Sequence, residues 1–252
     1  MIKEFFKRIG IPENTEIKYT PEFLSYINTQ CVLNIAYENI DILEGKDISL
    51  EFKDIYKKIV LEGKGGYCFE LNGLLTHILR EMGFNVTERF ARYLRGENEI
   101  PMRRHRVTVV NLNGEKYMCD IGVGEVAPRE ALKIEEGLIQ KQKDETYKFE
   151  KNEKHGWVLY DLYKGNWREY IAFNDDEQYD IDFIQPSFFC EKHSSSPFNK
   201  APMLAIKTEN GRKTIDGDIY KEFTGTDLTH IEENITPDRF KELLKTEFKL
   251  NR

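Results

Sequence analysis

The 252-residue sequence predicts an α+β fold, because helical and strand-like patterns occupy separate stretches of the chain. Apolar residues recur at helical spacing in the first stretch, up to Gly83. Beyond Gly83 the pattern changes to short runs of strand-forming residues bounded by turn signals. The final stretch mixes short strands with one last helix. This order of helices, then strands, then a mixed tail is typical of α+β proteins.

Three segments before Gly83 have helical patterns. Thr20 and Pro21 provide an N-cap and a first-turn proline for the first of them. Residues 50–61 also have apolar side chains at helical spacing. The third segment has one continuous apolar face, formed by Leu71, Leu74, Leu75, Ile78, Leu79 and Met82. Gly83 then gives a signal for the end of this helix.

A tight turn organises the strands that follow. Val107, Val109 and Leu112 are interspersed with the polar residues Thr108 and Asn111 up to Asn113-Gly114, a dipeptide that favours a hairpin turn. A return strand is predicted over residues 116–121. His105 begins the outgoing strand and Asp120 ends the returning one. The hairpin therefore predicts that these two side chains lie close together.

The rest of the chain is predicted to contain further strands and one helix. The strand predictions cover residues 86–94, 156–163, 167–173, 203–208 and 213–215. Asn210-Gly211 gives a second hairpin signal, and Thr236-Pro237 caps the final helix. Residues 140–155 are strongly charged, so we expect a solvated loop there.

Composition limits the classes of partner. Hydrophobic residues make up 40% of the chain, which supports a sizeable core, and the formal net charge is -7. This acidic balance argues against broad nucleic-acid binding and against attraction to an anionic membrane surface. The sequence shows no signal peptide and no long apolar stretch, so we expect a cytoplasmic protein without a membrane segment. No pattern in the sequence sets the oligomeric state.

The cysteines argue against a zinc or redox motif. They are widely separated and form no C-x-x-C pair: Cys31, Cys68, Cys119 and Cys190. No histidine pair has metal-site spacing either. We therefore expect free thiols in a reducing compartment and no metal.

One cysteine stands in a setting that favours reactivity. Cys68 follows the glycine-rich turn at residues 63–66 and directly precedes the amphipathic helix. A thiol at a helix N-terminus faces unpaired backbone N–H groups, so we expect its pKa to lie well below the ordinary value of roughly 8.5. The alternative is a small buried side chain, which is what most cysteines are.

A reactive thiol needs a base, and the base needs a group that fixes its tautomer. His105 and Asp120 could fill these roles in chain order after Cys68. Taken alone, His105 could belong to a basic surface patch, since arginines flank it, and Asp120 could be an ordinary turn carboxylate. The predicted hairpin couples the two residues and favours the catalytic interpretation of both.

Five short segments together resemble the arylamine N-acetyltransferases, and they occur in that family's order over nearly the whole chain. The segments are Ile35-Ala36-Tyr37-Glu38-Asn39-Ile40-Asp41, Gly65-Gly66-Tyr67-Cys68-Phe69-Glu70-Leu71-Asn72, Arg104-His105-Arg106, Asp120-Ile121-Gly122-Val123-Gly124 and Ser194-Ser195-Ser196-Pro197-Phe198. Each is weak by itself, but the cysteine, histidine and aspartate motifs together are highly specific.

The resemblance implies a fold and a chemistry. It implies a helical region over residues 1–84 that carries the nucleophile, a β-barrel over residues 85–193 that carries the histidine and aspartate, and an α/β lid over residues 194–252, with a cysteine-protease-like Cys-His-Asp core. It also implies ping-pong acetyl transfer from acetyl-CoA, with Cys68 acetylated before an arylamine, arylhydrazine or N-hydroxyarylamine accepts the group. The implied contacts to substrate or coenzyme A are Tyr37, Arg104, Val123, Gly124, Ser196 and Phe198.

The chain departs from the family pattern at Lys64, Tyr37 and Val123, and also in the residues that follow Pro197, near the implied coenzyme A contacts. Lys64 stands where the family has an arginine, which would form a forked ion pair with Glu38; lysine offers a single point charge, so we expect a weaker clamp. Tyr37 adds a hydroxyl to the acceptor pocket, although it could equally be a core aromatic residue. Val123 replaces a bulkier aromatic residue, so we expect a wider pocket wall.

Other functions share parts of this pattern. Papain-like proteases and transglutaminases also use a cysteine, a histidine and an aspartate or asparagine in this order. Within the family, an amide synthase or another acyl-CoA or thioester transferase fits the same residues. A non-catalytic scaffold would have no need of an intact catalytic set.

Overall fold

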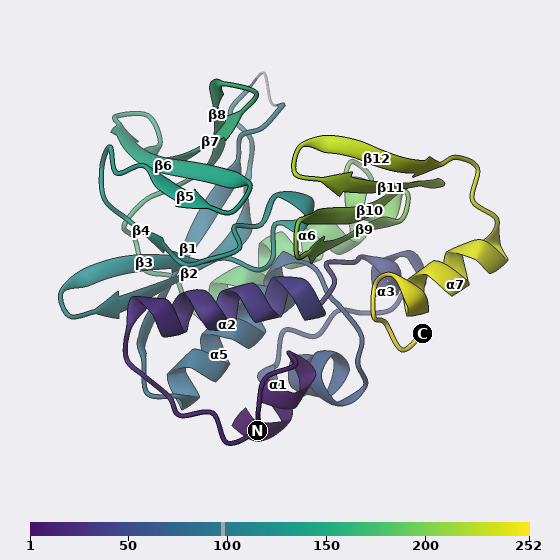
Figure 1. Cartoon of the computed structure of the whole chain (residues 1–252), viewed down its shortest axis with the longest axis horizontal. Helices are drawn as coiled ribbons and strands as arrows, with labels where there is room; N and C mark the ends of the chain where they lie inside the picture. Colours follow the sequence, from purple (N-terminus) through teal and green to yellow (C-terminus); the bar gives the residue numbers. More distant parts are fainter. Residues whose placement is uncertain (97–98) are drawn as a thin grey trace.

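The computed structural model describes residues 1–96 and 99–252 and has an α+β architecture. Helices lie below a large curved sheet, and a second, smaller sheet lies beside it with the last helix at its far side (Figure 1). Apolar side chains of the first, second and fifth α-helices pack against the second and third strands in the main hydrophobic core. This core supports the end of the large sheet at which the candidate site lies.

The first region contains the three predicted helical segments and two further helices, α1 and α3, that the sequence patterns did not indicate. They are α1 (Ile2–Arg8), α2 (Pro21–Asn34), α3 (Ile40–Leu43), α4 (Phe52–Tyr56), the π-helical turn η1 (Lys57–Leu61) and α5 (Cys68–Glu81). The hydroxyl of Thr20 accepts a bond from Phe23 N at 3.3 Å and caps α2 as predicted. The predicted helix at residues 71–82 is confirmed as α5, and its apolar face is buried.

The large sheet has eight strands within the described residues, in the order β4-β3-β2-β1-β8-β7-β6-β5. In chain order they are β1 (Asn85–Tyr93), β2 (Arg103–Leu112), β3 (Glu115–Cys119), β4 (Leu132–Lys133), β5 (Gln140–Gln142), β6 (Glu145–Asn152), β7 (Gly156–Tyr163) and β8 (Asn166–Phe173). Asn113 and Gly114 adopt φ angles of 52° and 83°, as a tight hairpin turn between β2 and β3 requires. The predicted hairpin is confirmed.

The prediction of a solvated loop over residues 140–155 is wrong. These residues form β5 and β6, and β6 pairs with β5 at its start and with β7 from Tyr147 to Asn152. The reason is an alternation hidden by the charged residues: Tyr147 and Phe149 point into the core with 3% and 0% exposure, and the residues between them point outward. The alternation of inward apolar and outward polar side chains, rather than the overall charge of the segment, decides that it forms strands.

Side chains join the two edge strands of this sheet. The amide of Gln140 on β5 accepts a bond from Lys133 N on β4 at 2.8 Å and donates one to Lys133 O at 2.9 Å. Gln142 makes the equivalent two bonds to the backbone of Glu130, at 3.0 and 3.2 Å. These bonds nearly close the sheet into a barrel, and the α+β fold with a central barrel-like sheet is confirmed.

The second sheet consists of four antiparallel strands, with the order β12-β11-β10-β9. They are β9 (Met203–Thr208), β10 (Gly211–Asp216), β11 (Ile219–Thr224) and β12 (Asp227–Glu232), and α7 (Pro237–Thr246) packs beside them. η2 (Gly124–Val126) connects β3 to β4, whereas η3 (Asp180–Phe183), α6 (Ile184–Lys192) and η4 (Pro197–Asn199) lie in the connection from β8 to β9. The sequence patterns did not indicate β11 or β12, because β12 is largely exposed and lacks apolar alternation.

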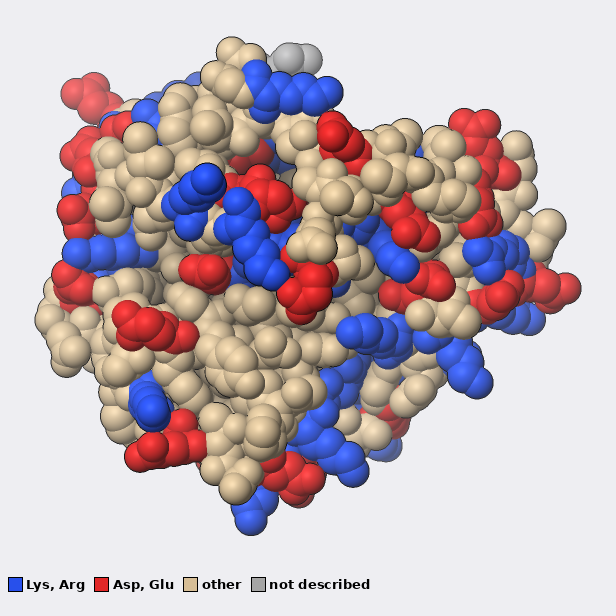
Figure 2. Space-filling view, in the orientation of Figure 1, with Lys and Arg blue, Asp and Glu red and all other residues tan. Residues whose placement is uncertain are grey.

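Acidic and basic side chains are interspersed over the face of the molecule shown in Figure 2. The formal net charge of -7 is therefore not gathered into a single patch on this face. In the part of the chain that the structure describes, no helix has both the length and the apolar character needed to cross a bilayer.

Candidate active site

Cys68 is the first residue of α5 and is held there by a capping box. Tyr67 is the N-cap, and the side chain of Glu70 accepts a bond from Tyr67 N at 3.3 Å. This arrangement fixes the chain direction at the start of the helix. The Cys68 thiol is 3% exposed and is directed toward the backbone oxygen of Arg104, at 3.8 Å.

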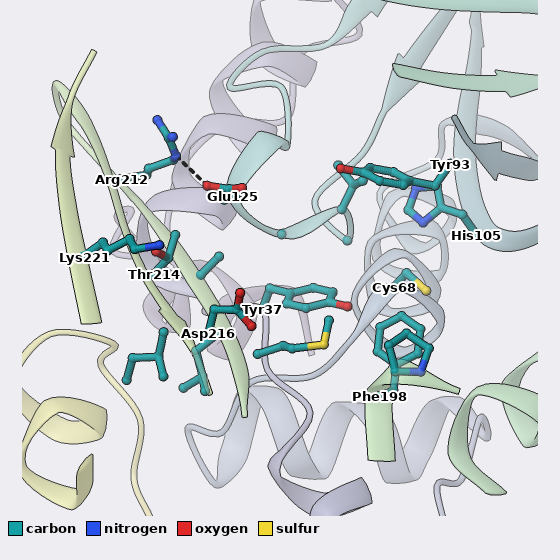
Figure 3. A pocket seen from close by; sticks show the side chains of 18 of the residues that line it. Tyr37, Cys68, Tyr93, His105, Glu125, Phe198, Arg212, Thr214, Asp216 and Lys221 are labelled. Atoms are coloured by element: carbon teal, nitrogen blue, oxygen red, sulfur yellow. Dashed lines mark hydrogen bonds and ion pairs between the residues drawn. The ribbon is translucent and has the colours of Figure 1, made fainter. Parts of the chain in front are cut away.

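The β2–β3 hairpin brings His105 and Asp120 together, as the sequence predicted. Nε2 of His105 lies 2.6 Å from Oδ2 of Asp120, and both side chains are almost fully buried. Because a carboxylate only accepts hydrogen bonds, Nε2 carries the proton of this bond, and in the neutral ring the free lone pair is therefore on Nδ1. Figure 3 shows the imidazole ring beside the sulfur of Cys68, so a base and a thiol face each other.

Asn72 orients the carboxylate of Asp120, and the sequence analysis did not single it out. Its side-chain amide donates to Oδ1 of Asp120 at 2.8 Å, and Gly122 N donates to the same oxygen at 2.9 Å. Asn72 lies one helical turn after Cys68 on α5, so both residues face the hairpin. The spacing of four residues was the signal that could have identified Asn72.

Gly122 allows the hairpin to approach the nucleophile. A Cβ atom at this position would lie 2.8 Å from the Cα atom of Cys68 and 2.9 Å from the amide nitrogen of Asn72. A side chain would therefore push the Asp120 strand away from α5. The distance between the two elements that carry the site depends on this glycine.

The surroundings of Cys68 oppose ionisation of its thiol. Burial raises the pKa of Cys68 well above its ordinary value, and Cys190 and the carboxylate of Asp120 raise it further. Backbone N–H groups, including that of Phe69 in the first turn of α5, lower the pKa, but burial outweighs them. The prediction of a low pKa from the helix position alone is therefore wrong. An ionised Cys68 needs a compensating positive charge nearby.

A cavity of about 490 Å³ opens beside Cys68 and His105 (Figure 3). This volume lies in the usual range for small-molecule sites. Five of the six residues predicted to contact substrate or coenzyme A line the cavity: Tyr37, Arg104, Val123, Gly124 and Phe198. The sequence analysis missed other lining residues, above all Tyr93, Glu125, Arg212 and Lys221. These come from separate strands and loops, which no local pattern connects.

Two comparisons identify the family. A family model described as N-acetyltransferase matches residues 20–251. The arylamine N-acetyltransferase of Mycobacterium tuberculosis is 30% identical over 219 residues, which cover 84% of this chain and 76% of that protein. The chain belongs to the arylamine N-acetyltransferase family. Membership in this family makes the protein an acyltransferase.

Solved arylamine N-acetyltransferases have the same fold as this chain. The M. tuberculosis structure superposes with a TM-score of 0.93 at 25% identity, covering 100% of this chain and 94% of that chain. A structure of the Mycobacterium marinum arylamine N-acetyltransferase in complex with CoA gives a TM-score of 0.92 at 24% identity, covering 100% of this chain and 93% of that one. The helical region, the barrel-like sheet and the second sheet are thus all parts of the family fold.

Ser196, the sixth residue predicted to contact substrate or coenzyme A, does not line the cavity. Its hydroxyl is 1% exposed, donates to the backbone oxygen of Cys190 and accepts a bond from Phe198 N at 3.2 Å. Asn39 holds the same loop from the other side, because its amide donates to the backbone oxygen of Phe198 at 2.8 Å. Ser196 therefore positions Phe198, which does line the cavity.

Lys64 does not pair with Glu38. Its ammonium group lies 2.8 Å from the carboxylate of Glu62 and is partly exposed. The guanidinium group of Arg252 lies against Glu38 instead, at 2.5 Å. The expected clamp at this position of the family motif is therefore replaced by one from the other end of the chain.

Among residues 1–96 and 99–252, no group of three or more His, Cys, Asp and Glu side chains is arranged to hold a metal ion.

Proposed function

We propose that the protein transfers an acetyl group from acetyl-CoA to an arylamine, arylhydrazine or N-hydroxyarylamine, with Cys68 acetylated between the two half-reactions. The observation that carries this proposal is the buried His105–Asp120 pair beside the Cys68 thiol in one open cavity. A nucleophile, a base and a group that orients the base are the components of acyl transfer. Membership in the arylamine N-acetyltransferase family supports the same reaction.

In the first half-reaction, His105 removes the proton from Cys68 through Nδ1, because Nε2 is bound to Asp120. The thiolate attacks the carbonyl carbon of acetyl-CoA, and the bond to the coenzyme A sulfur breaks. The imidazolium then protonates the departing thiolate of coenzyme A. Because one thioester replaces another, the step is nearly balanced in energy. The imidazolium supplies the positive charge that a buried Cys68 thiolate requires.

In the second half-reaction, the amine nitrogen attacks the acetyl-Cys68 carbonyl and His105 accepts the proton that the nitrogen loses. The bond between carbon and the Cys68 sulfur breaks, and the imidazolium returns its proton to the thiolate. Backbone N–H groups in the first turn of α5 are placed to stabilise the negative oxygen that develops in both half-reactions.

The wall of the cavity offers groups that match both substrates. Arg212 and Lys221 extend from the second sheet into the wall opposite Cys68 (Figure 3), where cations can meet the phosphates of coenzyme A. Tyr37 and Phe198 flank the thiol and offer aromatic faces to an arylamine. The M. marinum structure in complex with CoA shows that a protein of this fold binds coenzyme A, which supports acetyl-CoA as the acyl donor.

In this proposal the chain divides its tasks among three regions. Residues 1–84 supply the nucleophile, residues 85–193 supply the base and its carboxylate, and residues 194–252 cover the cavity. A cytoplasmic location is part of the proposal and comes from the sequence alone. The physiological acceptor is left open among aromatic amines and hydrazines.

Intact-mass measurement tests the proposal directly. Incubation with acetyl-CoA and no acceptor should add one acetyl group, and peptide mapping should place it on Cys68. Cys68→Ala should abolish the adduct, whereas Cys31→Ala, a buried cysteine in α2, should keep it. No adduct, or an adduct on Cys119, would overturn the proposal.

An acceptor panel separates acyl transfer from hydrolysis. Release of free coenzyme A should be fast with arylamines or arylhydrazines and slow with water alone. A cysteine hydrolase would release acetate at the same rate with and without an amine, and that outcome would contradict the proposed function.

A further inference from the structure

A buried arginine from the last residues of the sequence lies beneath the nucleophile turn. The Arg252 guanidinium lies 2.5 Å from the carboxylate of Glu38 through Nη2 and 2.8 Å from that of Asp41 through Nη1. The exposed fractions of these side chains are 7% for Arg252, 0% for Glu38 and 10% for Asp41. Two carboxylates and one planar cation thus form a cluster that is almost free of solvent.

Arg252 is the ion-pair partner that Glu38 requires. Within the part of the chain that the structure describes, Glu38 forms no other ion pair, since Lys64 pairs with Glu62. The other carboxylate oxygen of Glu38 accepts a bond from Ile40 N at 2.7 Å. Removing the guanidinium would leave a fully buried carboxylate with a backbone N–H group and the more distant charge of Lys58, which is itself paired with Asp41 and Glu70. Such a loss is costly in a protein interior.

Glu38 is in direct contact with the glycine turn that precedes Cys68. Its backbone N–H donates to the oxygen of Gly66 at 2.9 Å. A Cβ atom at Gly65 would lie 2.3 Å from the backbone oxygen of Ala36 and 2.6 Å from Cγ of Glu38. The segment that Arg252 holds is therefore packed so closely against the turn that even a Cβ atom at Gly65 would clash with it. Displacement of this segment displaces the residues just before Cys68.

A second route connects Arg252 to the start of α5. Asp41, which Arg252 also binds, lies 2.8 Å from the ammonium group of Lys58. Lys58 also lies 2.7 Å from Glu70, and Glu70 accepts the bond from Tyr67 N that caps α5. Four ionised side chains thus form one chain of contacts from Arg252 to the N-cap next to the nucleophile.

The backbone around Arg252 is fixed to the same part of the fold. Asn251 N donates to the oxygen of Gly63, at the start of the glycine-rich turn, at 3.1 Å. Lys249 donates through Nζ to the oxygen of Leu33, at the end of α2, at 2.9 Å. Residues 249–252 therefore cross the loop that leads into the nucleophile turn, and Figure 1 shows this end of the chain returning beside α3.

We infer that Arg252 is a positioning residue for the acetylation of Cys68. Its two-pronged contact with Glu38 and Asp41 holds the nucleophile turn and the N-cap of α5 in the geometry that faces His105. It takes the place of the clamp that the glycine-rich motif of this chain lacks at Lys64. The inference rests on Cys68 being the residue that is acetylated, as proposed above.

The chemistry of the cluster requires a guanidinium group. Burial disfavours the charge on Arg252, but the hydrogen bonds that its guanidinium donates to the carboxylates of Asp41 and Glu38, together with their negative charge, outweigh burial and raise the pKa of the guanidinium above its ordinary value. Arg252 is therefore charged at every working pH. A lysine could neutralise one carboxylate, but it lacks the planar fork that reaches two carboxylates on different sides.

Single-turnover acetylation tests the inference. Release of free coenzyme A is followed with acetyl-CoA and no acceptor, alongside the melting temperature of each variant. Arg252→Ala should lower the acetylation rate constant by about tenfold or more, since small misplacements of a nucleophile are costly. Arg252→Lys should lose several-fold. Lys249→Ala is the matched control: it removes a contact from the same segment and should acetylate within about twofold of the unsubstituted protein.

Chemical rescue separates positioning from general stability. Millimolar guanidinium chloride, far below denaturing concentrations, should restore part of the rate of Arg252→Ala, and ammonium chloride should not. Neither salt should change Lys249→Ala. Equal acetylation rates for Arg252→Ala and Lys249→Ala would overturn the inference. If Arg252→Ala does not fold, Arg252→Lys takes its place, and an acetylation rate equal to that of the unsubstituted protein would overturn the inference. Absence of acetyl-Cys68 in the unsubstituted protein would instead overturn the proposed function.

Discussion

The thiol of Cys68 is surrounded by groups that oppose its ionisation, and this makes His105 decisive at the scale of single residues. Burial, Cys190 and Asp120 all raise the thiol pKa, and the helix N–H groups do not compensate. A thiolate at neutral pH therefore requires that the proton stay close by on the imidazole. Asp120 promotes this transfer because it stabilises the imidazolium through Nε2.

Thiol alkylation across pH tests this role of His105. A thiol whose pKa is raised above about 9 is less than about one per cent ionised at pH 7, and it gains reactivity only as the pH rises toward its pKa. His105→Gln removes the base, so iodoacetamide should modify Cys68 at least about a hundredfold more slowly at pH 7, and the difference should shrink at higher pH. His230→Gln, at an exposed position on β12, should behave as the unsubstituted protein does. Equal rates at pH 7 would remove His105 from the mechanism.

The sequence alone could identify those site residues whose contacts lie close to them along the chain. The Asn113-Gly114 turn fixes the pairing of β2 and β3, so the proximity of His105 and Asp120 followed from the hairpin. Arg252 could not be found in this way, because 214 positions separate it from Glu38. The lowered pKa expected for Cys68 failed for a related reason, since the depth of burial is a property of the packed molecule.

At the scale of elements, β5 and β6 show how charge can conceal a strand. Lysine, glutamate and aspartate dominate residues 140–155, yet the two fully inward positions of β6 are the aromatic residues Tyr147 and Phe149. Phe149 is fully buried and makes edge contacts with Trp157 and Phe173, at ring-centroid distances of 6.2 and 6.1 Å. These strands close the far side of the barrel.

Phe149→Ala should therefore destabilise the protein strongly. Truncation of a buried phenylalanine costs about 3–5 kcal/mol in the free energy of unfolding, and urea denaturation measures it. Lys148→Ala, at the adjacent position on the other face of β6, should cost less than about 1 kcal/mol, since its ion pair with Glu150 is partly exposed. A solvated loop over these residues would make both changes equally mild, and such a result would contradict the strand assignment.

At the scale of the whole molecule, a buried arginine joins the two sheets, alongside more exposed ion pairs such as that between Lys143 and Glu209. Arg129 is 2% exposed and follows η2 in the loop before β4. Its guanidinium donates to the backbone oxygens of Thr208 at 2.7 Å and Gly211 at 2.9 Å, on the two sides of the β9–β10 turn. It also pairs with Asp144 of the β5–β6 hairpin at 3.1 Å. The second sheet is thus fixed to the barrel at a point from which β9 and β10 run into the cavity wall.

Arg129→Met should separate stability and substrate binding from the chemistry at Cys68. Loss of the buried guanidinium leaves two carbonyl groups and a carboxylate without their donor, so the free energy of unfolding should fall by about 3 kcal/mol. The second sheet would then move more freely against the barrel, and KM for acetyl-CoA and for the acceptor should rise several-fold. The rate of Cys68 alkylation at pH 7 should stay within about twofold, because the hydrogen bonds of the guanidinium go to the second sheet and to Asp144 rather than to α5 or the β2–β3 hairpin.

Arg239→Met, at a partly exposed ion pair on α7, is the control. It should leave KM unchanged and cost less than about 1 kcal/mol in the free energy of unfolding. If Arg129→Met lowered kcat and slowed alkylation while KM stayed constant, the two sheets would be coupled through the nucleophile itself rather than through the cavity wall.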